Sequence, residues 1–187
     1  MRFVLIRHSK TDRDPKVPIT RWGLSDEGIE LAKELSQDKI IKGLDVIYTS
    51  LQTKAIETAL LIAKPNHIAM KVDDRLTEVT SFTGAFEKDF DIYTKNVHDY
   101  YSGSIERIGE GETKTEALDR FIQGLESIAE IEDNKTYVGI ITHGNILALF
   151  AALYKDVDSY ELHMRIKQPD VAIFDWNEKK FDNFYGE

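Results

Sequence analysis

The sequence predicts an α/β fold in which a mostly parallel sheet lies between two helical layers, a three-layer α/β/α arrangement. Short runs rich in β-branched and aromatic residues alternate along the chain with longer stretches of helical periodicity, the pattern of successive β-α units. The strand-like runs are continuously apolar, as expected of strands that helices cover on both faces. The chain has 187 residues, and because domains commonly have about 100–200 residues, we predict one domain over residues 1–187.

The elements of the N-terminal half follow from these patterns. Residues 2–6, of which 3–6 are apolar, form the first predicted strand. The next helix is expected to begin after Ser25, a suitable N-cap, with acidic residues in its first turn, where they interact well with the helix dipole. Residues 44–50 form the second predicted strand, residues 51–63 a helix, and residues 67–72 a shorter strand.

The C-terminal half repeats the alternation. A long helix is expected to begin at Thr113, because Glu116 stands three residues later in capping-box spacing. Residues 136–142 form a predicted strand, residues 145–154 a helix, and residues 170–176 another strand. This order of elements is typical of a largely parallel sheet.

Two segments depart from the alternation. Residues 74–111 are predicted to be a small insertion that carries a short helix, and residues 178–187 a last edge strand and tail. We expect the aromatic residues of the insertion either to line the mouth of a pocket or to form core or dimer contacts, and a homodimer therefore stays open. They are Phe82, Phe86, Phe90, Tyr93, Tyr100 and Tyr101.

Composition restricts the partners and the location of the protein. Its net charge of −9 and pI near 5.1 argue against nucleic acid as a partner. The apolar start is interrupted at Arg7 and His8, and no apolar run reaches the roughly 18 residues of a membrane helix, so we expect neither a signal peptide nor membrane association. The chain has no cysteine, which excludes disulfides and a cysteine nucleophile and favours a cytoplasmic location.

Residues capable of binding an anion follow three of the predicted strands. Arg7 and His8 end the first strand, the second leads into a helix that bears Lys54, and His143 and Gly144 follow the strand at residues 136–142. Sites in open α/β sheets lie at the carboxyl ends of strands. Two histidines and two cations at one such edge predict an anion site, to which backbone N–H groups at the start of the last helix could add donors.

The motifs LIRHSKT, ITRWGLSDEGIELAKEL, DVIYTSLQTKAIETA, LTEV, GEGET and ITHGN carry a resemblance to a known family. In order and spacing they resemble the histidine phosphatase superfamily, which includes cofactor-dependent phosphoglycerate mutases and many small phosphatases. The resemblance covers residues 2–150 and, more loosely, the last strand. It implies a phosphoglycerate mutase-like fold and phosphoryl transfer through a phosphohistidine.

The resemblance assigns roles that the chemistry of each side chain can fill. His8 would be the nucleophile, because a neutral imidazole offers one nitrogen for in-line attack on phosphorus while a backbone carbonyl holds the other. Arg7, Lys54 and His143 would surround the oxygens of the transferring group and balance their charge. A rigid strand end suits these residues because in-line attack needs exact placement.

The leaving alkoxide needs a proton, and the resemblance assigns its donor to Glu78 in LTEV. A carboxyl group beside a bound anion holds its proton more readily, which suits a general acid at neutral pH. Glu112, in GEGET, is the rival candidate.

Three residues of the site differ from the family pattern. Ser9 stands where a glycine is usual, and its hydroxyl is expected to donate to phosphate. Lys54 stands where an arginine is usual, and it keeps the charge but loses the bidentate fork. Asn145 replaces a common second glycine and is expected to bind phosphate through its backbone N–H.

We therefore predict a phosphatase that hydrolyses a small phosphomonoester. No cofactor is expected, and no metal ion either, because both histidines are assigned to phosphate. Two alternatives stay open. One is a mutase that returns the phosphoryl group to a bound acceptor, although the chain is short for that role. The other is a phospho-ligand binding or regulatory protein in which Lys54 and Ser9 mark weakened chemistry.

Overall fold

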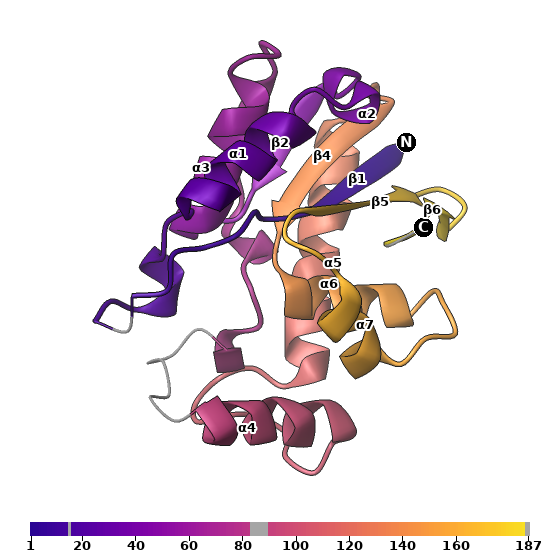
Figure 1. Ribbon diagram of the computed structural model, residues 1–187. Helices are drawn as coiled ribbons and strands as arrows, with labels where there is room; N and C mark the ends of the chain where they lie inside the picture. The colour runs from indigo at the N-terminus through magenta and orange to yellow at the C-terminus, as the bar shows by residue number, and fades with distance from the viewer. Residues whose placement is uncertain (15, 83–89, 186–187) are drawn as a thin grey trace.

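A computed structural model of the chain describes residues 1–14, 16–82 and 90–185 (Figure 1). The described residues form a sheet of six strands in the order β3-β2-β4-β1-β5-β6. β1 pairs with β4 in parallel, as β2 does with β3 and β4, while β5 runs antiparallel to β1 and β6. The predicted α/β fold with a mostly parallel sheet is confirmed. The strands are β1 (Arg2–Arg7), β2 (Val46–Thr49), β3 (Ala69–Val72), β4 (Tyr137–Thr142), β5 (Asp170–Asp175) and β6 (Lys180–Asn183).

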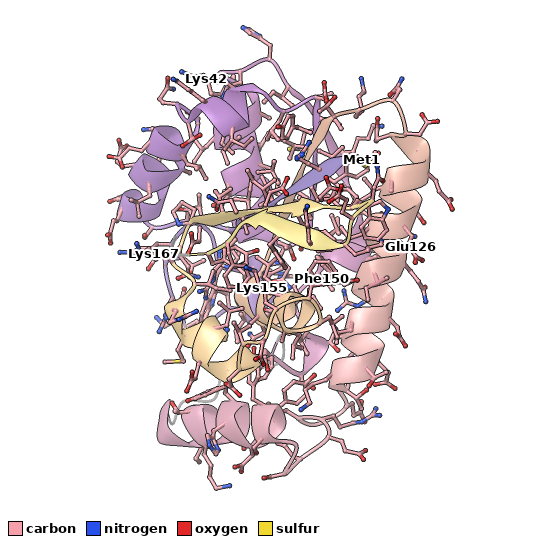
Figure 2. The ribbon with its side chains drawn as sticks, turned by 90° about the vertical axis from the view of Figure 1, so that its right-hand side faces the viewer. Met1, Lys42, Glu126, Phe150, Lys155 and Lys167 are labelled. Atoms are coloured by element: carbon pink, nitrogen blue, oxygen red, sulfur yellow. The ribbon has the colours of Figure 1, made fainter. Side chains whose placement is uncertain are left out.

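Helices cover both faces of this sheet. One face carries α1 (Asp26–Leu35), α2 (Lys39–Lys42) and α3 (Thr53–Ala63), and the other carries α5 (Lys114–Ile131) and α6 (Gly144–Ala152). Figure 2 views the sheet from its β6 edge, with α1 to α3 on one side and α5 on the other.

The alternation of side chains along β1 divides the core into two clusters. Phe3 and Leu5 pack with α5 and α6, whereas Val4 and Ile6 pack with α2 and α3. All four side chains are fully buried. Successive side chains of a strand point to opposite faces, so a continuously apolar strand is what two covering layers require.

Both predicted helix starts are confirmed. The Ser25 hydroxyl accepts a hydrogen bond from the N–H of Gly28 at the start of α1. Thr113 and Glu116 form the reciprocal capping box of α5. Each cap satisfies N–H groups that the first turn of a helix leaves without a partner.

Two short helices were not predicted, α2 and α7 (Ser159–Arg165). They have four and seven residues, too few for a helical period to stand out in the sequence. The remaining helical elements are α4 (Phe90–Ser102) and three 3₁₀ turns, Ile19–Arg21, Asp74–Leu76 and Thr80–Phe82. No helix in the described ranges is long and apolar enough to cross a membrane.

The segment at residues 74–111 contains α4, the short helix predicted for it, which packs against α7 (Figure 1). Phe82, Tyr100 and Tyr101 are buried in the core cluster on the α5 face of the sheet. Of these three, Phe82 also lines the pocket described below. Phe86 lies outside the described residues, as do the side chains of Phe90 and Tyr93.

Candidate active site

The pairing of β1 with β4 brings the two histidines together. Arg7 lies opposite Thr142 in the parallel register, and the N–H of His8 donates to the Thr142 carbonyl at 2.9 Å. His143 directly follows β4, and its ring centroid lies 5.1 Å from that of His8. The parallel sheet thus places side chains that are remote in sequence at one edge.

The ring of His8 is held in one tautomer. Its Nδ1 lies 2.7 Å from the backbone carbonyl of Ser9. Because a carbonyl can only accept, Nδ1 carries the proton and Nε2 keeps its lone pair. Burial, together with the charges of Lys54 and Arg7, holds the pKa of His8 well below its usual value. The ring is therefore neutral at neutral pH, as a nucleophile must be.

His143 is fully buried and begins α6. Its Nε2 lies 2.8 Å from the hydroxyl of Ser50, and its Nδ1 has no hydrogen-bond partner among the described residues. Burial and the neighbouring His8, Lys54 and Arg7 hold its pKa well below the usual value. His143 is therefore a neutral ring with one nitrogen left for a ligand.

Arg7 lies against the start of α6. One terminal nitrogen, Nη1, donates to the carbonyl of Ile166. A Cβ added to Gly144 would lie 2.7 Å from Arg7 Cζ, closer than carbon atoms can pack. The glycine of the HG motif therefore makes room for the guanidinium of Arg7.

Lys54 reaches the pocket from α3. Its side chain is almost fully buried, and Nζ donates to the carbonyl of Ile19 at 2.9 Å. Burial lowers the pKa of Lys54 to about 8, although Glu78 acts in the opposite direction. The ammonium group is still mostly charged at neutral pH, and little water competes for its remaining N–H donors.

Glu78 caps the start of α6. Its Oε1 accepts from the N–H groups of Val79 and Ile146, at 2.9 and 3.0 Å. Its Oε2 accepts from the backbone N–H and the side-chain amide of Asn145, at 3.1 and 3.0 Å. The backbone donors at this helix start, which the sequence suggested for an oxyanion of the ligand, thus hold a carboxylate of the protein itself.

Glu112, the rival candidate, has a different setting. Its carboxylate accepts from Arg120 at 2.6 and 2.8 Å and from the N–H of Thr80 at 3.1 Å. Arg120 in turn donates to the carbonyls of Arg75 and Thr77 and, at 3.4 Å, to that of Glu78. Glu112 therefore fixes the segment that carries Glu78, whereas Glu78 itself lines the pocket.

Two of the predicted phosphate contacts need correction. The hydroxyl of Ser9 donates to the carbonyl of Gly28 at 2.7 Å, and its backbone N–H donates to the hydroxyl of Thr58. Ser9 is fully buried on the α1 side and does not line the pocket. The backbone N–H of Asn145, expected to bind phosphate, donates to Glu78 instead.

The carboxyl ends of β1 and β4 and the start of α6 border a cavity of about 230 Å³. Six of the predicted site residues line it: Arg7, His8, Lys54, Glu78, His143 and Asn145. Among the described residues, its side chains include three cations, those of Arg7, Lys54 and Arg13, and one carboxylate, that of Glu78. In a protein of net charge −9, this local excess of positive charge suits an anionic ligand.

The sequence did not single out several residues that line the cavity, among them Gln52, His163 and Gln168. Gln52 follows β2 and begins α3, and this position at a strand end was a usable signal. His163 lies on α7, and burial and the charge of Arg7 lower its pKa to about 4. Nothing in the pattern around it pointed to the pocket. No three acidic or histidine side chains of the described ranges form a cluster that could hold a metal ion.

Sequence comparison identifies the family. The sequence model of the histidine phosphatase superfamily (branch 1) matches residues 3–183. The chain belongs to this superfamily. Membership supports phosphatase or mutase activity in general, and the resemblance noted in the motifs is confirmed. No curated protein matches the sequence.

Solved structures of similar fold include three at low sequence identity. YhfR of Bacillus stearothermophilus has a TM-score of 0.78 and 21% identity, over 99% of this chain and 96% of its own. A phosphoglycerate mutase from Bacillus anthracis has a TM-score of 0.77 and 18% identity, over 99% of this chain and 92% of its own. A mycobacterial glucosyl-3-phosphoglycerate phosphatase complexed with VO3 has a TM-score of 0.76 and 16% identity, over 98% of this chain and 97% of its own. At these identities the likeness shows a phosphoglycerate mutase-like fold.

Proposed function

We propose that this member of the superfamily is a phosphatase that hydrolyses a small phosphomonoester through a phosphohistidine at His8. The main support is the setting of His8. Its neutral ring is fixed through Nδ1 by the carbonyl of Ser9 and lies 5.1 Å from the ring of His143, inside a cationic cavity. The cavity is smaller than the ~300–1,000 Å³ of pockets for drug-sized ligands, which favours a small substrate.

In the first step, His8 Nε2 attacks phosphorus, and the bond between phosphorus and the ester oxygen breaks. Arg7 and Lys54 balance the negative charge of the phosphoryl oxygens. The Ser50 hydroxyl donates to His143 Nε2, and His143 Nδ1–H is left to donate to a phosphoryl oxygen. The leaving oxygen takes a proton from Glu78 and departs as an alcohol.

In the second step, water attacks the phosphohistidine. Glu78, now a carboxylate, takes a proton from the water while the water oxygen bonds to phosphorus and the P–N bond breaks. Inorganic phosphate leaves, and His8 and Glu78 return to their starting states. A hydrolase needs no second substrate site, because water replaces the acceptor that a mutase must hold.

The test is phosphate release from 4-nitrophenyl phosphate together with chemical trapping of the intermediate. We expect turnover in the wild type and phosphate covalently bound to His8 in an alkaline quench, detected by peptide mass spectrometry. His8→Ala should abolish both. His98→Ala, which changes an exposed histidine on α4, is the matched control and should keep both.

Other outcomes identify the alternatives. Transfer of the phosphoryl group between phosphoglycerates without phosphate release would assign a mutase. Binding of vanadate without turnover or a labelled histidine would assign a phospho-ligand binding protein. Turnover that survives in His8→Ala would overturn the proposal.

A further inference from the structure

We propose that Asn145, oriented by Tyr101, is a positioning residue that controls proton uptake by Glu78. This inference rests on the proposed role of Glu78 and concerns how that acid is prepared for each step. Three side chains form the chain of contacts. The hydroxyl of Tyr101 donates to Asn145 Oδ1 at 2.9 Å, and Asn145 Nδ2 donates to Glu78 Oε2 at 3.0 Å.

The four donors to Glu78 leave no site for a proton. A carboxylate has about four lone-pair sites, and four N–H groups approach this one, two at each oxygen. A proton on either oxygen must replace one of these hydrogen bonds. Glu78 therefore becomes an acid only when one donor moves away.

The side-chain amide of Asn145 is the donor best able to move. The other three N–H groups belong to the backbone of Val79, Asn145 and Ile146. The last two lie in the first turn of α6, whose backbone is fixed by the helix. Rotation about side-chain bonds alone can turn the Asn145 amide, which opens a proton site on Oε2.

Tyr101 sets how readily the amide turns. Its side chain is 8% exposed and packs against the rings of Tyr160 and His163 on α7, with centroids 5.6 and 5.7 Å away. A ring held on these sides directs its hydroxyl at Asn145 Oδ1. The hydrogen bond fixes the amide with Nδ2 toward Glu78, and so favours the carboxylate that the second step needs.

Other charged and titratable groups near Glu78 come from four helices, and the two test variants, Asn145→Ala and Tyr101→Phe, leave them unchanged. They are Lys54 on α3, Tyr100 on α4, Arg120 on α5 and His163 on α7. Of these, Arg120 contacts the backbone carbonyl of Glu78 and not its carboxylate. A change that depends on Asn145 is therefore separable from their effects.

The experiment compares two substrates of similar shape. Phenyl phosphate needs protonation of its leaving oxygen, whereas 4-nitrophenyl phosphate depends on it much less. At each pH, kcat/KM for phenyl phosphate is divided by kcat/KM for 4-nitrophenyl phosphate. This ratio isolates the general acid, because phosphate binding and the nucleophile contribute to both values. In the wild type this ratio should fall as pH rises and Glu78 loses its proton.

Asn145→Ala removes one donor, so the fall in the ratio should move to higher pH by about one unit, the effect expected for one charge-assisted hydrogen bond. Tyr101→Phe should move it in the same direction by less. Tyr100→Phe, which removes a hydroxyl that donates to the Glu112 carbonyl from the same helix, is the matched control and should leave it in place. In a Glu78→Gln background, Asn145→Ala should have no further effect on the ratio.

A second measurement does not depend on turnover. The side-chain carboxyl carbon of Glu78, assigned by its absence in Glu78→Gln, is followed by carbon NMR as pH changes. Its titration midpoint should rise in Asn145→Ala and, by less, in Tyr101→Phe. Unchanged midpoints in both variants would overturn this inference even if His8 is phosphorylated, whereas a missing phosphohistidine would overturn the proposed function alone.

Discussion

The imidazole rings of His8 and His143 meet edge to face, 5.1 Å apart with an interplanar angle of 61°. Each ring is held through one nitrogen, His8 by the carbonyl of Ser9 and His143 by the hydroxyl of Ser50. The opposite nitrogen of each ring is left for chemistry. Because burial and nearby cations keep both rings neutral, one can attack a phosphoryl group while the other donates to it.

The charge of Lys54 predicts an alkaline limit to activity. Burial lowers its pKa to about 8, so the ammonium group is present below that pH and is lost above it. We expect kcat/KM for 4-nitrophenyl phosphate to fall by up to about tenfold per pH unit above this value. In Lys54→Arg the guanidinium stays charged, and this limb should disappear even if the absolute rate is lower.

Lys33→Arg is the matched control for this change, because Lys33 is exposed and pairs with Glu30 on α1. It should keep the alkaline limb of the wild type. The measurement is the pH profile of kcat/KM from about pH 7 to about pH 10. An alkaline limb that is the same in Lys54→Arg would show that another group causes it.

The sequence predicted the sheet and its two helical layers because each main strand carries its own signal. In β1, four successive apolar residues end at Arg7, and this pattern can be recognised from the local sequence alone. The orientation of β5 had no such signal. A strand covered on both faces reads alike in either direction, and only its pairing with β1 shows that it is antiparallel.

Within the site, the residues that follow strands were predictable, and their partners were not. His8 and His143 end strands that parallel pairing brings together, so their position follows from the pattern. The partner of the Ser9 hydroxyl is the carbonyl of Gly28, on α1, and that of the Asn145 amide is Glu78. Such contacts depend on how remote segments pack, which local sequence does not contain.

The setting of Glu112 predicts a role in stability. Both its oxygens bind Arg120, which holds the carbonyls of Arg75 and Thr77. Glu112→Gln should lower the free energy of unfolding by about 1–2 kcal/mol, because the partly buried arginine loses its charged partner. Denaturant titration measures this, with the exposed Glu30→Gln as a control that should change stability by less than about 0.5 kcal/mol.

The same variant separates Glu112 from Glu78 as the acid. Glu112→Gln should keep the wild-type ratio of phenyl phosphate to 4-nitrophenyl phosphate hydrolysis at low denaturant. Glu78→Gln should lower that ratio by about 10²-fold, the lower end of a general acid's contribution. If Glu112→Gln lowers this ratio without lowering the free energy of unfolding, Glu112 is the proton donor.

Gly144 predicts a variant that loses activity without losing stability. A Cβ there would lie 2.7 Å from Arg7 Cζ, and the flexible end of the arginine can move aside at little cost to the fold. Gly144→Ala should therefore lower kcat/KM by about ten- to a hundredfold through misplacement of Arg7. The melting temperature should not fall, because alanine is the better helix former.

Gly43→Ala serves as the control, because a Cβ there meets its nearest atom at 3.5 Å and Gly43 does not line the pocket. It should keep wild-type activity. If Gly144→Ala also keeps it, the close approach of Arg7 to α6 is not needed for function.

The histidines of the pocket predict a loss of stability in mild acid. The pKa values of His8 and His143 are held well below their usual value, and that of His163 is lowered to about 4. Between these values and about 6.5, the unfolded chain binds protons that the folded protein does not, so stability is full above about pH 6.5 and falls as pH decreases. Each histidine should contribute up to about 1.4 kcal/mol per pH unit. Denaturant titrations at several pH values measure the slope of the free energy of unfolding against pH. This slope should be smaller by one histidine's share in His143→Asn and unchanged in His98→Asn. Equal slopes in the wild type and both variants would mean that the buried ring takes up its proton without unfolding.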